Sequence, residues 1–183
     1  MILVVAPAGY GKTTLVVDWL GQSGVPSAWL QLDEADNGPV RFFTYFVASL
    51  QAVYPQVGQS LLDALHRIVP ESPEALVHSL INDLAAVDGP VLLALDDYHL
   101  IDARLVQEAM AYLLDHAPPN LHLVVLTRTD PPFPLPRLRV RGQMTEIRGA
   151  DLRFTPADMT AFLNALHGLN LPAEQIAALE SRT

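Results

Sequence analysis

The sequence has 183 residues, and at roughly 150 residues per domain this length predicts one compact domain with a short extension. Hydrophobic residues make up 50% and charged residues 17%, a balance that excludes a disordered tail or a low-complexity linker. The formal net charge of −9 provides no basic surface for nucleic acid, so direct DNA binding is not expected. The absence of cysteine excludes disulfides and cysteine-ligated zinc. No apolar run reaches the ~20 residues of a membrane span, so we expect a cytoplasmic protein without membrane contact.

Strand-like and helix-like patterns alternate along the chain. In chain order they predict a strand at 2–6, a helix at 12–20, a strand at 27–32, helices at 41–54, 60–68 and 72–86, a strand at 91–95, a helix at 102–116, and strands at 121–126 and 144–147. Helices at 155–166 and from 172 onward complete the pattern. Ser72 and Thr155 are each followed by proline and are expected to cap their helices.

The predicted strands are apolar along their whole length, which is typical of parallel strands covered by helices on both faces. Because these strands alternate with helices, right-handed crossovers are expected between them. The sequence therefore predicts an α/β fold with a doubly wound parallel sheet. We expect this domain to span 1–150, and the helices of 151–183 to begin a second subdomain.

The strongest motif lies between the first strand and the first helix. It matches the phosphate-binding loop G-x-x-x-x-G-K-[ST], with Ala6 in place of the first glycine. Glycines at 9 and 11 permit close approach of a phosphate to the backbone amides. Lys12 is expected to contact the β- and γ-phosphates, and the Thr13 hydroxyl to bind Mg²⁺. The full set expected to bind the nucleotide is Ala8, Gly9, Tyr10, Gly11, Lys12, Thr13 and Thr14.

A second motif places two carboxylates directly after the buried strand at 91–95. Ligands of parallel α/β sheets bind at the carboxyl ends of the strands. Asp96 is expected to hold Mg²⁺, and Asp97 to orient or deprotonate the attacking water. A simple helix-capping pair is the alternative. Asp33, which ends the strand at 27–32, is a rival for the water-activating role.

Polar residues also end the strand at 121–126, where Arg128 is the candidate sensor of the γ-phosphate. The segment 127–130 superficially matches the guanine-reading N-K-x-D, but arginine replaces lysine, so GTP is disfavoured. The alternating arginines of 137–141 fit either a phosphate or partner contact or an exposed edge strand. None of the 6 histidines shows metal-ligand spacing, and a structural role is favoured for His99 beside the acidic pair.

Several of these segments closely resemble the nucleotide-binding domain of MalT-type transcriptional regulators of the LuxR family. The segments that carry the resemblance are 6–14, 29–37, 95–99, 127–135 and 151–154. Such domains are signal-transduction ATPases of the STAND class, related in design to apoptotic and plant-resistance ATPases. The resemblance implies a five-stranded sheet with the sensor strand between the phosphate-loop and acidic strands, followed by helical and winged-helix regions.

The resemblance also implies a mechanism. ADP holds the resting state, and inducer binding to a distant repeat domain permits exchange to ATP, homo-oligomerisation and promoter binding through a helix-turn-helix. On the matching positions, Lys12 and Thr13 bind phosphate and Mg²⁺, Asp96 binds Mg²⁺, Asp97 the water and Arg128 the γ-phosphate. We therefore expect a slow, regulatory P-loop ATPase.

The sequence departs from the family pattern at both ends. From the family pattern we expect that the segment helping to hold adenine, the winged helix, the repeat sensor and the helix-turn-helix lie outside the given residues. We expect an excised piece that binds nucleotide weakly, hydrolyses it slowly and does not bind DNA by itself. Two rival interpretations are a small-molecule P-loop kinase with Arg137 and Arg139 as a lid, and an interaction module whose nucleotide site has decayed.

Overall fold

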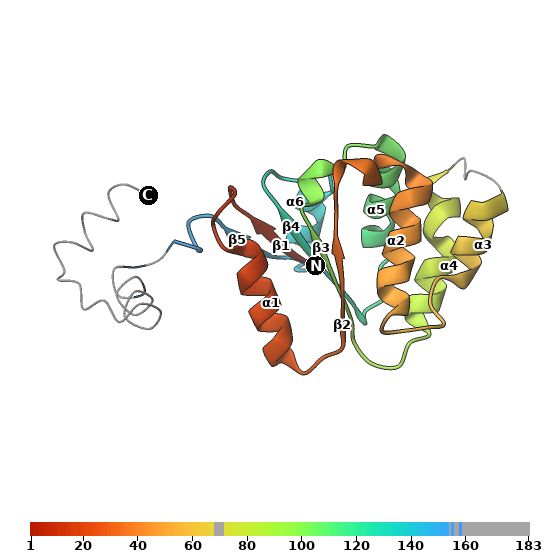
Figure 1. Ribbon diagram of the computed structural model, residues 1–183, viewed down its shortest axis with the longest axis horizontal. Helices are drawn as coiled ribbons and strands as arrows, with labels where there is room; N and C mark the ends of the chain where they lie inside the picture. Colours follow the sequence, from red (N-terminus) through yellow and green to blue (C-terminus); the bar gives the residue numbers. More distant parts are fainter. Residues whose placement is uncertain (68–71, 154, 156–157, 159–183) are drawn as a thin grey trace. The chain divides into compact units, whose positions relative to one another are not determined.

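The computed structural model describes residues 1–67, 72–153, 155 and 158 (Figure 1). Its elements, in which η marks a short 3-10 helix, are β1 (Ile2–Val5), α1 (Lys12–Ser23), β2 (Ser27–Gln31), η1 (Glu34–Asn37), α2 (Pro39–Gln51), α3 (Gln59–Arg67), α4 (Pro73–Ala85), β3 (Val91–Asp96), η2 (Tyr98–Leu100), α5 (Arg104–Asp115), β4 (Leu121–Thr127), α6 (Leu135–Val140) and β5 (Thr145–Arg148). The chain divides into two compact units, Met1–Gly149 and Ala150–Thr183. Every helix of the described residues is too short or too polar to cross a lipid bilayer.

Five strands form one sheet in the order β2-β3-β4-β1-β5, and every neighbouring pair is parallel. The predicted sensor strand, β4, lies between β1 and β3, which confirms the order that the family resemblance implied. Because all five strands run in the same direction, their carboxyl ends meet at one edge of the sheet. The phosphate-binding loop, the acidic pair and the Arg128 segment follow β1, β3 and β4, and all three lie at this edge.

Helices cover both faces of the sheet, as the apolar strands predicted. Figure 1 shows α1 on one side of the sheet and α2, α3, α4 and α5 on the other. In β3, where every residue is buried, Leu93 and Leu95 join the main hydrophobic cluster. Leu92 and Ala94 point to the opposite face and are buried outside that cluster. This burial on both faces explains why the strand sequences do not alternate between apolar and polar residues.

The helix boundaries differ from the predictions where glycine and proline set them. α1 continues through the predicted stop at Gly21 and ends at Ser23, where Gly24 takes the left-handed conformation with φ 67° and caps the helix. α2 begins at Pro39, earlier than predicted, because Pro39 occupies the first turn after the extended residue Gly38. The predicted cap of α4 is confirmed, since Ser72 Oγ accepts a hydrogen bond from the Ala75 amide at 3.2 Å.

The arginine-rich segment after β4 forms a helix, so the edge strand, one of the two alternatives for this segment, was wrong. Within α6, Leu135 and Leu138 are three residues apart and both buried, while Arg137 and Arg139 are exposed. The Pro134 carbonyl accepts hydrogen bonds from the amides of Arg137 and Leu138 at 3.0 and 3.1 Å. Alternating arginines are compatible with a strand or a helix. The helix forms because it places Leu135 and Leu138 on one face, where both are buried in the main core.

In the second unit, the hydrogen bonds expected of the predicted Thr155 cap are present. Asp158 Oδ2 accepts from the Thr155 amide at 2.9 Å, and Thr155 Oγ1 accepts from the Asp158 amide at 3.2 Å. These two bonds form the reciprocal pattern of a capping box. The remainder of the helix predicted at 155–166, and the final helix predicted from 172, lie outside the described residues.

Candidate functional site

The loop between β1 and α1 contains two glycines in the left-handed backbone region. Gly9 has φ 82° and Gly11 has φ 74°, a conformation that residues with a Cβ rarely adopt. Among the described residues beyond their chain neighbours, no atom lies within 4 Å of a Cβ built at either position. Backbone shape, rather than crowding, therefore requires glycine here. No described side chain caps α1, so its first amides remain available to an anion.

Lys12 is the single lysine of the sequence, and its side chain folds back over the start of this loop. Its Nζ donates hydrogen bonds to the Ala6 and Pro7 carbonyl oxygens at 2.8 and 3.0 Å. Burial lowers the pKa of Lys12, and the negative charges of Asp96 and Asp97 partly oppose this shift. Ala6 contributes its carbonyl oxygen and not its side chain. This explains why alanine can replace the first glycine of the motif.

The Thr13 side chain joins the phosphate-binding loop to the end of β3. Thr13 Oγ1 donates a hydrogen bond to Asp96 Oδ2 at 2.7 Å. Asp96 is 2% exposed, and its other carboxylate oxygen accepts from the Asp97 amide at 2.8 Å. A hydroxyl and a carboxylate oxygen side by side are the hard oxygen donors that Mg²⁺ prefers. The two residues predicted to hold the metal are thus in contact, and their donor atoms fit it.

Asp97 turns the chain sharply after β3. It is the one non-glycine residue of the described part of the chain with a positive φ, at 55°, a region that aspartate occupies more readily than most residues. Its Oδ2 accepts a hydrogen bond from Gln31 Nε2 at 2.6 Å. Sequence reasoning missed Gln31. Its position at the end of β2, in register with Asp96, becomes informative only when the strand order is known.

His99 lies beside the same carboxylate. Its Nδ1 is 3.8 Å from Asp97 Oδ1, and this nitrogen is buried without a hydrogen-bond partner among the described residues. Burial lowers the pKa of His99, and the positive charge of Arg128 lowers it further. The neutral imidazole is therefore favoured. The sequence favoured a structural role for His99, whereas the structure places its ring next to the predicted water-activating residue.

The three predicted motifs share one pocket of about 340 Å³, a volume within the range of small-molecule sites. Its walls are formed by Ala8, Gly9, Gly11, Lys12, Thr13, Thr14, Asp97 and Arg128. Two predicted site residues are not part of its walls. Asp96 is buried and hydrogen-bonded to Thr13, and Tyr10 is half-buried near Gly149, just after β5.

Asp33, the rival carboxylate, has local partners instead. Its Oδ1 accepts from the Ala35 amide at 2.7 Å, and its own amide donates to Asp36 Oδ2 at 2.9 Å, which together close a capping box on η1. Arg41 pairs with the carboxylates of Asp36 at 2.8 Å and Asp33 at 3.5 Å. Asp33 does not line the pocket that contains the phosphate-binding loop.

The arginines of 137–141, of which Arg137 and Arg139 were candidates for a phosphate lid, lie beside carboxylates. Arg137 pairs with Asp115 at 2.9 Å, and Arg141 lies 3.9 Å from the same carboxylate. Arg139 pairs with Glu146 of β5. None of these three arginines lines the pocket formed by the phosphate-binding loop. Arg128 is therefore the arginine of this region that reaches the predicted site.

These features define the class of the domain. A five-stranded parallel sheet whose first strand leads through a glycine-rich loop into α1, with a buried aspartate at the end of β3, is an α/β domain of the P-loop NTPase type. The loop follows β1 and the aspartate ends β3, and these two strands lie on either side of β4. The hydrogen bond from Thr13 to Asp96 nevertheless joins the two motifs.

Comparisons with known proteins identify the type more closely. The chain is 40% identical over 177 residues to the HTH-type transcriptional regulator MalT of Yersinia enterocolitica, and 41% identical over 167 residues to MalT of Serratia proteamaculans. It is 33% identical over 186 residues to the serine/threonine-protein kinase PknK of Mycobacterium tuberculosis. These matches cover 96%, 90% and 100% of this chain. The chain is a nucleotide-binding domain of the MalT type, as the resemblance predicted.

The chain spans less than a fifth of the length of these relatives, at 19%, 18% and 17% respectively. No protein-family model matches it. The similarity therefore concerns a limited segment of these relatives.

Proposed function

We propose that this chain is the nucleotide-dependent switch of a larger, signal-responsive transcription activator of the STAND class and LuxR family. In this proposal it binds ATP or ADP with Mg²⁺, hydrolyses ATP slowly, and couples the γ-phosphate to oligomerisation. The observation that carries the proposal is the convergence of Lys12, Thr13, Asp97 and Arg128 on one pocket. The names of the MalT relatives support the transcriptional part.

Phosphate binding rests on the loop amides and on Lys12. The left-handed glycines shape the loop, and the uncapped first turn of α1 presents amides to an anion. A lysine ammonium group has three donors. Since Ala6 and Pro7 accept two of these hydrogen bonds, the third is available to a phosphate oxygen.

Thr13 and Asp96 are the residues that would hold Mg²⁺, which would neutralise charge between the β- and γ-phosphates. The Thr13 hydroxyl proton is directed at Asp96, so the lone pairs of the hydroxyl oxygen remain available to a cation. The Asp97 amide fixes the second Asp96 oxygen. The carboxylate is therefore held in place before any ligand binds.

Hydrolysis requires a base near the γ-phosphate, and Asp97 has the surroundings for this role. Gln31 orients one of its oxygens, while the other faces His99. Asp97 accepts a proton from the attacking water, the water oxygen bonds to the γ-phosphorus, and the bond to the leaving ADP oxygen breaks. Arg128 stabilises the negative charge on the γ-phosphate and distinguishes ATP from ADP.

The sharpest test uses the fact that Lys12 is the single lysine. An acyl-phosphate derivative of ATP, which transfers its acyl group to a nearby amine, is expected to label Lys12, and excess ATP or ADP is expected to block the labelling. In equilibrium binding, Lys12→Ala is expected to weaken both nucleotides by about 10- to 100-fold, as expected for loss of a charged hydrogen bond.

Arg104→Ala is the matched control, because it also removes one positive charge but from the exposed start of α5. This variant is expected to bind both nucleotides normally. Thermal melting of each variant shows whether it is folded. Unchanged nucleotide affinity in a folded Lys12→Ala variant would contradict the phosphate-binding assignment and with it the proposed function.

A further inference from the structure

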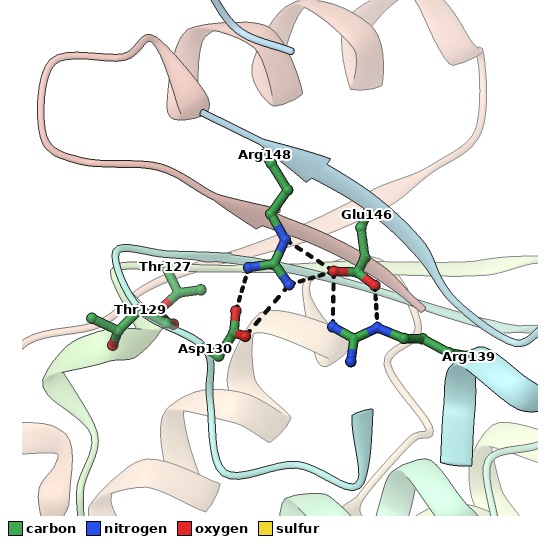
Figure 2. Close-up of polar contacts among 6 residues, drawn as sticks. All are labelled: Thr127, Thr129, Asp130, Arg139, Glu146 and Arg148. Atoms are coloured by element: carbon green, nitrogen blue, oxygen red, sulfur yellow. Dashed lines mark hydrogen bonds and ion pairs between the residues drawn. The ribbon is translucent and has the colours of Figure 1, made fainter. Parts of the chain in front are cut away.

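Four charged side chains form a connected network beside the site, outside the residues assigned above. Arg148, the last residue of β5, contacts both Asp130 and Glu146, and Arg139 of α6 contacts Glu146 as well (Figure 2). Arg148 Nε lies 2.9 Å from Glu146 Oε2, and an Arg139 nitrogen lies 3.0 Å from the same oxygen. Arg148 binds both carboxylate oxygens of Asp130, one of them at 3.5 Å.

The position of this network in the sheet gives it a connection to the nucleotide pocket. β1 lies between β4 and β5, and Val5 at the end of β1 is in register with Thr127 of β4 on one side and Arg148 of β5 on the other. Arg148 therefore reaches past the end of β1 to contact Asp130 in the loop after β4 (Figure 2). The next residue after Val5, Ala6, begins the phosphate-binding loop. The ion pair between Asp130 and Arg148, called the Asp130–Arg148 bridge below, thus joins the loop after β4 to β5. β4 and β5 are the two strands on either side of β1, which leads into the phosphate-binding loop.

The bridge also fixes one end of the segment that carries Arg128. At the other end, Thr127 is 1% exposed, and its Oγ1 donates a hydrogen bond to the Thr129 carbonyl at 2.8 Å. Arg128 lies between these two anchors and forms part of the pocket wall. The Thr127 bond closes a tight turn around Arg128, and the Asp130–Arg148 pair ties that turn to β5.

An isolated ion pair on a protein surface contributes little, but this arrangement is favourable in two respects. Arg148 presents its planar guanidinium to two carboxylates, and its side chain is only 35% exposed. Hydrogen bonds that Glu146 accepts from Arg139 and Arg148 lower the pKa of Glu146 to about 2, and the hydrogen bonds that Arg148 donates to Asp130 and Glu146 raise the pKa of Arg148. Glu146 and Arg148 therefore stay charged near neutral pH.

We propose that the Asp130–Arg148 bridge is a positioning device for Arg128, and that it sets the preference of the pocket for ATP over ADP. This inference rests on the proposed function of the pocket. ATP carries the γ-phosphate that Arg128 contacts in that proposal, whereas ADP does not. Releasing the loop from β5 therefore weakens ATP binding and leaves ADP binding unchanged. A merely structural role would weaken both nucleotides together.

The test compares the dissociation constants of ATP and ADP in the full chain and in Asp130→Asn and Arg148→Gln. Asp130→Asn removes the ion pair at nearly constant size, and Arg148→Gln removes it with a shorter, uncharged side chain. Both are expected to raise the dissociation constant of ATP about three- to tenfold, in proportion to the loss of a partly buried ion pair. The dissociation constant of ADP is expected to stay unchanged. Asp130→Glu keeps the charge and is expected to retain most of the ATP preference. Arg104→Gln, which breaks the Arg104–Glu108 pair on α5, is the matched control and is expected to change neither constant.

A double-mutant comparison isolates the action through Arg128. In an Arg128→Ala background, Asp130→Asn is expected to cause no further loss of ATP affinity, because the group that it positions is gone. Three results would each overturn the inference: an equal loss of ATP and ADP affinity in Asp130→Asn, no change in either affinity, or losses of ATP affinity that add fully when Asp130→Asn is combined with Arg128→Ala.

Failure of this inference can be separated from failure of the proposed function. If Lys12→Ala weakens both nucleotides and Arg128→Ala removes the ATP preference, the function stands, and an unchanged ATP-to-ADP ratio in Asp130→Asn rejects only the positioning role. If folded Lys12→Ala keeps its nucleotide affinity, the proposed function itself fails. Thermal melting of Asp130→Asn and Arg148→Gln identifies any variant that is unfolded, and the other variant then decides.

Discussion

Two neighbouring strands, β2 and β3, are each followed by a carboxylate, Asp33 and Asp97, and the surroundings of these two carboxylates differ sharply. At the end of β2, Asp33 is bonded to the Ala35 amide and pairs with Arg41, so its partners are nearby in sequence. At the end of β3, Asp97 contacts Gln31 of a neighbouring strand and shares a pocket with Lys12 of the phosphate-binding loop. The first carboxylate closes a local turn, and the second joins a site assembled from distant segments.

The comparison shows that an acidic residue at a strand end is not by itself evidence of catalysis. Asp33 and Asp97 occupy similar positions relative to their strands, and the sequence favoured Asp97 for the water-activating role with Asp33 as its rival. Their surroundings differ because the Asp33 carboxylate has partners close in sequence, the Ala35 amide and Arg41. At the β3 end, Asp96 accepts hydrogen bonds from the Asp97 amide and the Thr13 hydroxyl, whereas the Asp97 side chain lines the pocket.

The largest expected effect is on hydrolysis at the β3 end. Asp97→Asn removes the proposed base while keeping the size of the side chain, so single-turnover ATP hydrolysis is expected to fall by about 10²- to 10⁴-fold. ATP affinity is expected to remain, because Asp97 is not assigned to phosphate binding. Rapid-quench measurement of ADP formation, together with equilibrium ATP binding, checks both expectations.

Asp33→Asn is the matched variant at the β2 end. Asparagine is as good an N-cap as aspartate, so this variant is expected to fold and to hydrolyse ATP at the rate of the unmodified chain. A large loss of hydrolysis in Asp33→Asn, with normal rates in Asp97→Asn, would reverse the assignment of the two strand ends.

A smaller effect is expected on stability at the β2 end. Asp33→Ala removes the capping oxygen of η1 and the contact with Arg41, and is expected to lower the free energy of unfolding by about 1 kcal/mol. Urea unfolding followed by circular dichroism measures this change. ATP and ADP affinities are expected to stay unchanged, since Asp33 does not line the pocket. Weaker nucleotide binding at full stability would count against a purely local role.

The smallest expected effect is a pH dependence of the free energy of unfolding that comes from His99, near the end of β3. The pKa of His99 is lowered from its ordinary value of 6.5 in the folded chain, so below about pH 6.5 the unfolded chain binds more protons at this residue. The free energy of unfolding is therefore expected to fall as the pH drops through this range. At the β2 end, Arg41 stays charged throughout and gives no such dependence.

His99→Asn is expected to remove this part of the pH dependence. The measurement is urea unfolding of both proteins at several pH values between about 7.5 and 5.5, the range in which histidine titrates. Identical slopes in the two proteins would show that burial of His99 does not couple its protonation to folding.

Much of the fold could be predicted, because unbroken apolar strands separated by amphipathic helices have few ways to bury their surfaces. The strand order came from the family resemblance and is confirmed. The local errors also have physical causes. The end of α1 depended on which of two glycines, Gly21 or Gly24, took the left-handed conformation. The helical form of α6 depended on burial of Leu135 and Leu138 in the main core.

The sequence by itself determined the shape of the glycine-rich loop between β1 and α1, since the conformational freedom of Gly9 and Gly11 is a local property that a short motif records. It also determined which strands end in carboxylates. Only the tertiary structure decided the partners of those ends: the Thr13–Asp96 bond, the contact of Gln31 with Asp97, and the reach of Arg148 to Asp130. These contacts join residues from different strands, and their formation depends on strand order and register, which sequence spacing does not encode.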